Sequence, residues 1–226
     1  MHLRAFKNQP FGLFCDRCHE GGMPVNEIMG SAPSKELSKS ERTRERIMTA
    51  ATKEFADFGV AGARIDRIAQ NAKANKSQIY EYFGNKDRLF EIVLEGKLGE
   101  IYETVKFTPD DLPSYAGMLF DFAMDHPDLM RLVMWNGLEQ SRSWPLGESV
   151  SLASQVEQIA SGQRAGIIDK TYPATFLLTL IVTMASAWTA ANPFGMSINP
   201  DAQKERPDLR AAIIKAVRAL SGPQAR

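Results

Sequence analysis

Residues 75–90 read NKSQIYEYFGNKDRLF, and this stretch decides the fold. Polar and aromatic residues at helical spacing predict a short helix that ends at Gly84, followed by a new helix that begins near Lys86. Just upstream, residues 65–72 read IDRIAQNA, with apolar side chains on one helical face. Two short helices joined by a tight turn, the second rich in Lys, Ser, Gln and Tyr, predict a helix-turn-helix that can lay one helix in a DNA major groove.

The distribution of charge agrees with nucleic-acid binding at this end of the chain. The 226 residues have a formal net charge of +0, which by itself argues against a nucleic-acid partner. Residues 35–90, however, carry 12 Lys and Arg against 8 Asp and Glu, whereas residues 91–226 are net acidic. This asymmetry favours a module that meets phosphate beside a body that does not.

Hydrophobic periodicity predicts an all-α protein, and no alternating strand pattern of useful length is present. Apolar residues from Ile47 to Phe58 predict a first helix that ends at Gly59, and a long helix is expected from about 86 to 106. Further helical segments are expected near residues 111–125, 127–140, 149–164, 172–191 and 207–220. We therefore expect three parts: a disordered N-terminal extension at 1–34, a helix-turn-helix DNA-binding domain at 35–90, and a helical effector-binding and dimerisation domain at 91–226.

Cysteine content and hydropathy favour a cytoplasmic protein. Two cysteines cannot build a disulfide framework, and the N-terminus lacks the pattern of a secretory signal. Residues 174–191 are uncharged, but they are interrupted by Thr and Ser, so a buried or subunit-interface helix is expected there rather than a membrane span.

The chain resembles the tetracycline-repressor (TetR) family of one-component transcription regulators over about residues 40–92. The residues that carry the resemblance are Ala50-Ala51 through Phe55, Phe58-Gly59, Ile68-Ala69, and Ile79-Tyr80-x-Tyr82-Phe83-x-x-Lys86-x-x-Leu89-Phe90. The resemblance implies a three-helix DNA-binding head, a larger helical body that holds a ligand and dimerises, and no enzymatic activity.

Two residues depart from the family pattern. Ala63 lies where a Thr or Ser usually caps the second helix, and a methyl group cannot accept a hydrogen bond from the helix N–H groups. Lys73 occupies the place of the usual turn glycine, which adds a charge near the DNA.

By this resemblance, the helix after Asn75 enters the major groove. Lys and Gln can bond base edges, Ser discriminates less, and Tyr hydroxyls and Lys reach phosphate. The expected DNA contacts are Lys76, Ser77, Gln78, Tyr80, Tyr82 and Lys86, with Arg64, Arg67 and Lys73 as further candidates. The alternative for the two tyrosines is a packed aromatic core. The expected partners are a double-stranded palindromic operator and a second copy of the chain, because one recognition helix alone binds weakly.

The body supplies two further sets of candidates. Aromatic and Met side chains suit an adaptable apolar cavity, although each is alternatively an ordinary core residue. The cavity candidates are Tyr102, Tyr115, Met118, Phe122, Met130, Met134, Trp135 and Trp144. Two stripes at i, i+4 spacing are expected to pair two subunits, with an intramolecular core as the alternative, namely Phe176, Leu180, Met184 and Trp188, and Leu209, Ile213, Ala216 and Leu220.

Rival functions find less support. His is scarce and no glycine-rich phosphate loop or nucleophile elbow occurs, so no enzyme and no cofactor are expected. Cys15, Cys18 and His19 match a short C-x-x-C-H pattern, which leaves open a metal- or redox-responsive regulator. A helical interaction module that has lost DNA binding is the remaining alternative. The sequence thus predicts a dimeric DNA-binding regulator, most simply a repressor released by a small apolar or aromatic effector.

Overall fold

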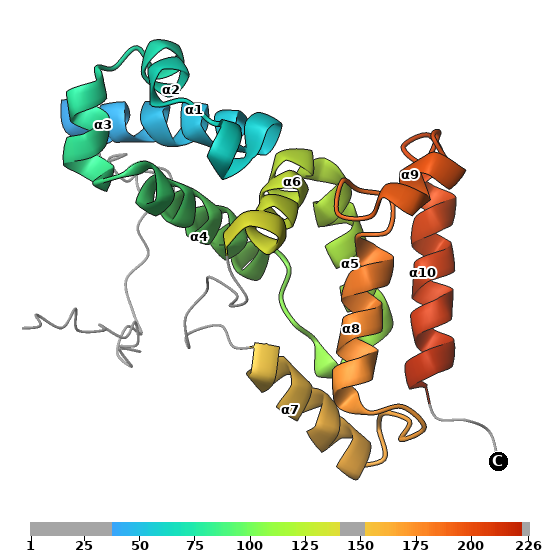
Figure 1. Cartoon of the computed structure of the whole chain (residues 1–226). Coiled ribbons are helices and arrows are strands. Elements are labelled where there is room, and N and C mark those ends of the chain that lie inside the picture. The colour runs from blue at the N-terminus through green and yellow to red at the C-terminus, as the bar shows by residue number, and fades with distance from the viewer. Residues whose placement is uncertain (1–37, 141–151, 223–226) are drawn as a thin grey trace, which may run out of the picture. The chain divides into compact units, whose positions relative to one another are not determined.

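The computed structural model describes residues 38–140 and 152–222, and these residues are helical with no strands among them (Figure 1). The predicted all-α fold is therefore confirmed, while the expectation of disorder at 1–34 lies outside the described residues. The helices are α1 (Lys39–Gly62), α2 (Ile65–Ala72), α3 (Lys76–Phe83), α4 (Lys86–Thr104), α5 (Leu112–Asp125), α6 (Pro127–Trp135), α7 (Leu152–Arg164), α8 (Ala174–Ala185), α9 (Pro193–Ile198) and α10 (Arg206–Ser221). A 3-10 turn η1 (Pro109–Asp111) precedes α5, and a π-helical turn η2 (Asn136–Gln140) follows α6.

Helix α1 is the core of the head. Ser38 caps its N-terminus, and Ser38 and Glu41 each bond the other's backbone N–H in a capping box. Ile47 and Phe55 are fully buried, and the Phe55 ring meets the Phe90 ring edge-on at 5.3 Å. These contacts hold α1 against α2 and α4, as the apolar spacing of the sequence predicts.

Helix α1 is broken near its end by Gly59. This residue has φ 68° and ψ −178°, so the regular helix stops there and a last turn continues to Gly62. Residues with a Cβ rarely adopt this φ because it brings the Cβ into steric strain, and glycine has no Cβ. The predicted end of the first helix at Gly59 thus corresponds to a kink inside α1.

In the body, α5 packs against both α8 and α10, and α8 and α10 also contact each other. Gly117 on α5 allows this close packing, because a Cβ there would lie 3.0 Å from the Ile214 side chain of α10. Phe120 of α5 packs edge-on against Trp188, with ring centroids 6.2 Å apart. No helix among the described residues is long and apolar enough to span a membrane.

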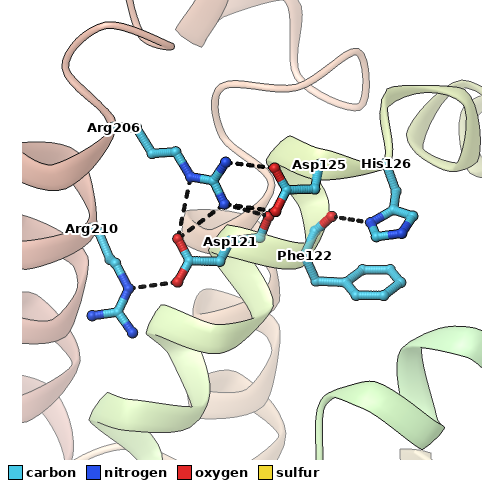
Figure 2. A network of polar contacts seen from close by, with 6 residues as sticks. All are labelled: Asp121, Phe122, Asp125, His126, Arg206 and Arg210. Carbon is cyan, nitrogen blue, oxygen red and sulfur yellow. Dashed lines mark hydrogen bonds and ion pairs between the residues drawn. The ribbon is translucent and has the colours of Figure 1, made fainter.

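A charged network fixes the first turns of α10 on α5 (Figure 2). Arg206 donates to both Asp125 carboxylate oxygens at 2.5 and 2.9 Å and to Asp121, and Arg210 donates to the other Asp121 oxygen at 2.6 Å. Beside it, His126 stacks on Phe122, and its Nδ1 lies 2.8 Å from the Phe122 carbonyl oxygen. Hydrogen bonding to ionised partners is stronger than between neutral groups, so this network sets the position of α10.

Two segments differ from the sequence prediction. The segment predicted as one helix at 127–140 changes at Asn136 from α6 to the π-helical η2. The segment predicted at 172–191 is α-helical only to Ala185, and the short α9 that follows was not predicted. Ser186 donates to the Val182 carbonyl at this helix end, a local hydrogen bond that side-chain hydroxyls favour where helices stop.

We predict that Asp125→Asn lowers the urea midpoint of unfolding at pH 7 and that this effect fades in acid. Hydrogen bonding to Arg206 lowers the pKa of Asp125 below its ordinary value. A lowered folded pKa gives stability that is present above the unfolded pKa, about 3.9, and is lost as pH falls through the folded pKa. The exposed Asp110→Asn serves as control. An Asp125→Asn deficit that is equal at pH 7 and pH 3 would contradict the assignment.

Candidate functional site

Helix α3 presents one polar face and buries the other. Asn75 caps it, because its Oδ1 accepts from the Gln78 N–H at 2.8 Å while the Gln78 Oε1 accepts from the Asn75 N–H at 3.0 Å. Ile79 and Phe83 are buried in the head, as the sequence indicates. This anchoring leaves Lys76, Ser77 and Tyr80 on the exposed face, with Tyr80 50% exposed.

Several predicted DNA contacts have partners within the chain. Lys76 forms an ion pair with Asp66 of α2, and the Ser77 hydroxyl donates to Asn75 Oδ1 at 2.5 Å. The hydroxyls of Tyr82 and Ser40 lie 3.1 Å apart, which joins α3 to the first turn of α1. Tyr82 is half-buried against the core of the head, in part as the aromatic-core alternative expects. The other residues in these contacts are exposed, where ion pairs and hydrogen bonds exchange with water at little cost, so phosphate can replace them.

Arg67 of α2 is bound by a buried carboxylate of the head, that of Glu54. Glu54 of α1 is only 4% exposed, and its Oε1 accepts from the Arg64 backbone N–H and from Arg67 Nε, both at 2.8 Å. The Arg67 guanidinium also lies 4.2 Å from the centroid of the Phe58 ring. Glu54 therefore holds the backbone at Arg64, the N-cap residue of α2, whose own side chain is exposed and makes no capping hydrogen bond.

Lys86, at the start of α4, points to the linker between α1 and α2. Its Nζ donates to the carbonyl oxygens of Ala61 at 3.5 Å and Ala63 at 3.3 Å. Its ammonium group thus lies beside the last turn of α1, at the N-terminal end of α4.

Sequence reasoning missed the role of Glu54, whose position one residue before Phe55 on the apolar side of α1 was the available signal.

Lys73 forms the turn between α2 and α3 in the left-handed conformation, with φ 48° and ψ 47°. Among the described residues it is the one non-glycine position with positive φ. Its N–H closes α2 by donating to the Gln70 carbonyl oxygen at 3.2 Å. The substitution of the usual glycine therefore leaves the turn geometry intact and places an exposed ammonium group beside α3.

The kink in α1 is closed by three side chains from α6 and η2, Arg131, Trp135 and Glu139, which we call the kink clasp. Arg131 Nε and Trp135 Nε1 donate to the Ala56 carbonyl oxygen at 2.6 and 3.1 Å. The Glu139 carboxylate accepts from the Val60 and Ala61 N–H groups at 2.8 and 3.1 Å. In an unbroken helix Ala56 would bond Val60, so the clasp replaces backbone bonds that the kink removes.

An apolar cavity of about 440 Å³ lies in the body. Its lining residues come from α4, α5, α6, α7, α8 and the segment after α8. The volume of the cavity and its place between these helices suit a small organic ligand. Tyr102, Tyr115 and Met130 line it, as the sequence suggested. Burial raises the pKa of Tyr115 to about 12, so this phenol is neutral at ordinary pH.

The other proposed cavity residues lie elsewhere. Met118 is exposed, Phe122 stacks on His126, Trp135 belongs to the kink clasp, and Met134 is not among the lining residues. Trp144 lies outside the described residues. Met118, Phe122, Met134 and Trp135 are thus not among the lining residues, and the expectation for Trp144 stays a prediction. An aromatic or Met side chain in a helical body packs in many ways, and composition alone does not tell which face it occupies.

Sequence reasoning missed the polar part of the cavity wall. Gln155 of α7 and a row of hydroxyl residues on α8 line the cavity, namely Thr175, Thr179, Thr183 and Ser186. Their spacing of three or four residues was the available signal, since such residues share one helix face.

The stripes proposed for subunit pairing lie beside the contact between α8 and α10. Phe176 is 46% exposed, and Leu180, Met184 and Trp188 are partly exposed. On α10, Leu209, Ala216 and Leu220 are partly exposed, but Ile213 is 3% exposed and packs within its own chain. Met184, Trp188, Leu209 and Leu220 pack in part against the core of their own chain, and Phe176 is the most exposed residue of the two stripes.

No metal-binding group of three or more His, Cys, Asp or Glu occurs within residues 38–140 and 152–222. Cys15, Cys18 and His19 lie outside these ranges.

Gly59→Ala is expected to destabilise the protein more than Gly84→Ala. Both glycines have positive φ, but a Cβ at Gly59 would lie 2.5 Å from Glu139 Oε1 and 2.9 Å from Trp135, whereas one at Gly84 meets nothing within 4 Å. Each strained residue costs about 1–3 kcal/mol, and Gly59→Ala also displaces the clasp. Urea unfolding of both variants measures the difference, and equal losses would contradict the role of the clasp.

Lys73→Gly is expected to raise the free energy of unfolding by about 1 kcal/mol, because glycine adopts the left-handed conformation without the Cβ penalty. Lys73→Asn should lie between glycine and the parent, and Lys73→Ala should bring no gain. Chemical denaturation of the three variants tests this, and a loss of stability in Lys73→Gly would show that the lysine side chain stabilises the turn.

Comparison with known proteins identifies the family. Residues 47–93 match the model of bacterial regulatory proteins of the tetR family, and residues 111–219 match that of tetracyclin repressor-like C-terminal domains. The chain is 42% identical over 156 residues to the HTH-type transcriptional repressor SCO4008 of Streptomyces coelicolor, covering 68% of this chain and 81% of that protein. It is 31% identical over 144 residues to the HTH-type transcriptional repressor NicS of Pseudomonas putida, covering 57% of this chain and 67% of that protein.

The fold agrees with this assignment. The crystal structure of SCO4942 from Streptomyces coelicolor, assigned to a transcriptional regulator, is 34% identical and superposes with a TM-score of 0.70 over 80% of this chain and 99% of that one. The chain belongs to the tetracycline-repressor (TetR) family of helix-turn-helix transcription regulators, which bind DNA and are not enzymes.

Proposed function

We propose that this protein is a cytoplasmic homodimeric repressor that binds a palindromic operator through α3 and is released when a small apolar or aromatic ligand fills the body cavity. The observation that carries the proposal is the arrangement of α6. This one helix lines the cavity with Met130 and Val133 and holds the α1 kink with Arg131 and Trp135.

The exposed face of α3 supports base reading by Lys76, Ser77 and Gln78. Gln78 keeps its amide nitrogen free for a base while its oxygen caps α3, and Lys76 can exchange Asp66 for a guanine or a phosphate. Tyr80 and Tyr82, two residues apart on α3, each supply a hydroxyl for a phosphate contact, and Tyr82 would exchange its contact with Ser40 for one. Arg64, Lys73 and Lys86 add positive charge on both sides of the helix.

Dimerisation supplies the second half-site. The apolar flanks of α8 and α10 lie in adjacent helices, and Phe176 is exposed at one end of the α8 stripe. Pairing these flanks across a two-fold axis would form a four-helix interface and bury them from water. Two α3 helices would then meet two major grooves of an inverted repeat.

Ligand release follows from differential binding. A ligand acts on the operator only if it prefers the conformation of α6 that binds DNA poorly, by a few kcal/mol for an efficient switch. A shift of α6 moves the kink clasp, and with it the last turn of α1 and the linker to α2. The DNA-binding helices are thereby repositioned without any contact between ligand and DNA.

The first experiment is selection of genomic fragments by the purified full-length protein, followed by titration of the best fragment against salt. We expect an inverted repeat, bound with an affinity that falls steeply as salt rises, because Lys and Arg release counterions from phosphate. Weak binding that does not distinguish sequences would contradict the proposal.

Lys76→Ala and Gln78→Ala are each expected to weaken operator binding by roughly 5- to 100-fold, the range of one lost base contact. The control is Lys53→Ala, which removes the same charge from an exposed position on α1 paired with Asp57. Fluorescence anisotropy measures affinity, and sedimentation should show unchanged dimers. An equal loss in the control would assign the effect to net charge instead of recognition by α3.

A further inference from the structure

We propose that the ligand of the body cavity is an uncharged, mainly apolar molecule with one hydrogen-bonding group, and that this group binds at Tyr115 and Gln155. The inference rests on the proposed function, since it concerns the ligand that occupies this same cavity. It goes further by assigning a charge state and an orientation to that ligand.

The cavity wall provides no charge to pair with a ligand. Among the described residues, its lining is aliphatic, aromatic, thioether, amide or hydroxyl, and it includes no Asp, Glu, Lys or Arg. Moving a carboxylate or an ammonium group from water into such a site without a counter-charge costs several kcal/mol. Charged molecules are therefore disfavoured relative to neutral molecules of the same shape.

The buried polar groups gather where α5 and α7 line the cavity. Tyr115 and Gln155 are 5% and 7% exposed, and their two side chains are hydrogen-bonded to each other. Phe107 packs edge-on against the Tyr115 ring at 5.0 Å, which holds the ring in place. Since burial raises the pKa of Tyr115 to about 12, this site offers neutral hydrogen-bonding groups in a fixed position.

The hydroxyl row of α8 adds weak acceptors and no charge. The Thr179 hydroxyl donates to the Thr175 carbonyl oxygen at 2.8 Å, and the Ser186 hydroxyl donates to the Val182 carbonyl oxygen at 2.9 Å. Their protons are used within the helix, so these two residues present oxygen lone pairs to the cavity. A neutral ligand can lie along this wall, which offers an ion hydroxyl dipoles but no counter-charge.

The test uses four compounds with one biphenyl skeleton, two of them neutral, one an anion and one a cation. The uncharged fluorophore N-phenyl-1-naphthylamine is bound to the full-length protein and displaced by biphenyl, 4-phenylphenol, 4-phenylbenzoate or 4-phenylbenzylammonium. We expect 4-phenylphenol to bind most tightly, at least about tenfold more tightly than either ion, because the ions lose their hydration without a counter-charge.

Two variants test the orientation. Tyr115→Phe and Gln155→Leu should each lower the affinity for 4-phenylphenol by roughly tenfold, the cost of a lost buried hydrogen bond, while the affinity for biphenyl stays unchanged. Met118→Ala is the control, because Met118 lies on the same helix as Tyr115 but is exposed and is not a lining residue. Circular dichroism checks that each variant is folded.

The inference is overturned if either ion binds as tightly as 4-phenylphenol, if none of the four compounds displaces the fluorophore, or if both variants bind 4-phenylphenol like the parent. Operator affinity is measured separately with saturating 4-phenylphenol. The expected displacement order together with unchanged operator affinity would uphold the ligand class and contradict release by ligand.

Discussion

The break in α1 at Gly59 is the constraint on which the rest of the structure depends. A helix that stops at a positive φ leaves carbonyl oxygens and N–H groups without their helical partners, and a buried backbone group without a partner is costly. Here the missing partners come from distant sequence: Arg131 and Trp135 serve the carbonyl side, and Glu139 serves the N–H side. The head therefore completes its own backbone hydrogen bonding only when α6 and η2 lie against it.

The same break determines how the DNA-binding helices are held. After the kink, the chain turns into α2, and Glu54 and Lys86 bind opposite sides of that linker through its N–H and carbonyl groups. The position of α2, and so of α3, thus depends on the last turn of α1. In the proposed mechanism, a movement of α6 reaches α3 through these hydrogen bonds. Packed contacts between helices, such as that between α6 and α1, tend to adopt discrete arrangements, which suits a switch.

Local signals in the sequence predicted much of the head. The stop at Gly84 and the buried Ile79 and Phe83 follow from periodicity and stop signals within a few residues. The Asn75 cap was not predicted, although it is a signal of the same local kind. The role of Glu54 was missed although its place on the apolar side of α1 was a signal. The kink clasp could not be predicted in this way, because its hydrogen bonds join residues that lie 75 to 79 positions apart in sequence. In the body, Tyr102, Tyr115 and Met130 were found by composition, whereas Trp135 was misplaced. Its indole N–H needs an acceptor, and the kink in α1 supplies one.

The most direct test of the coupling is operator affinity measured with and without saturating 4-phenylphenol, in the parent and in Glu139→Ala. The neighbouring exposed Leu138→Ala serves as control. The account predicts that the ligand weakens operator binding strongly in the parent and the control. In Glu139→Ala the weakening should be much smaller, although the cavity binds the ligand equally well. If Glu139→Ala released the operator as the parent does, the kink clasp would not connect the cavity to the DNA-binding helices.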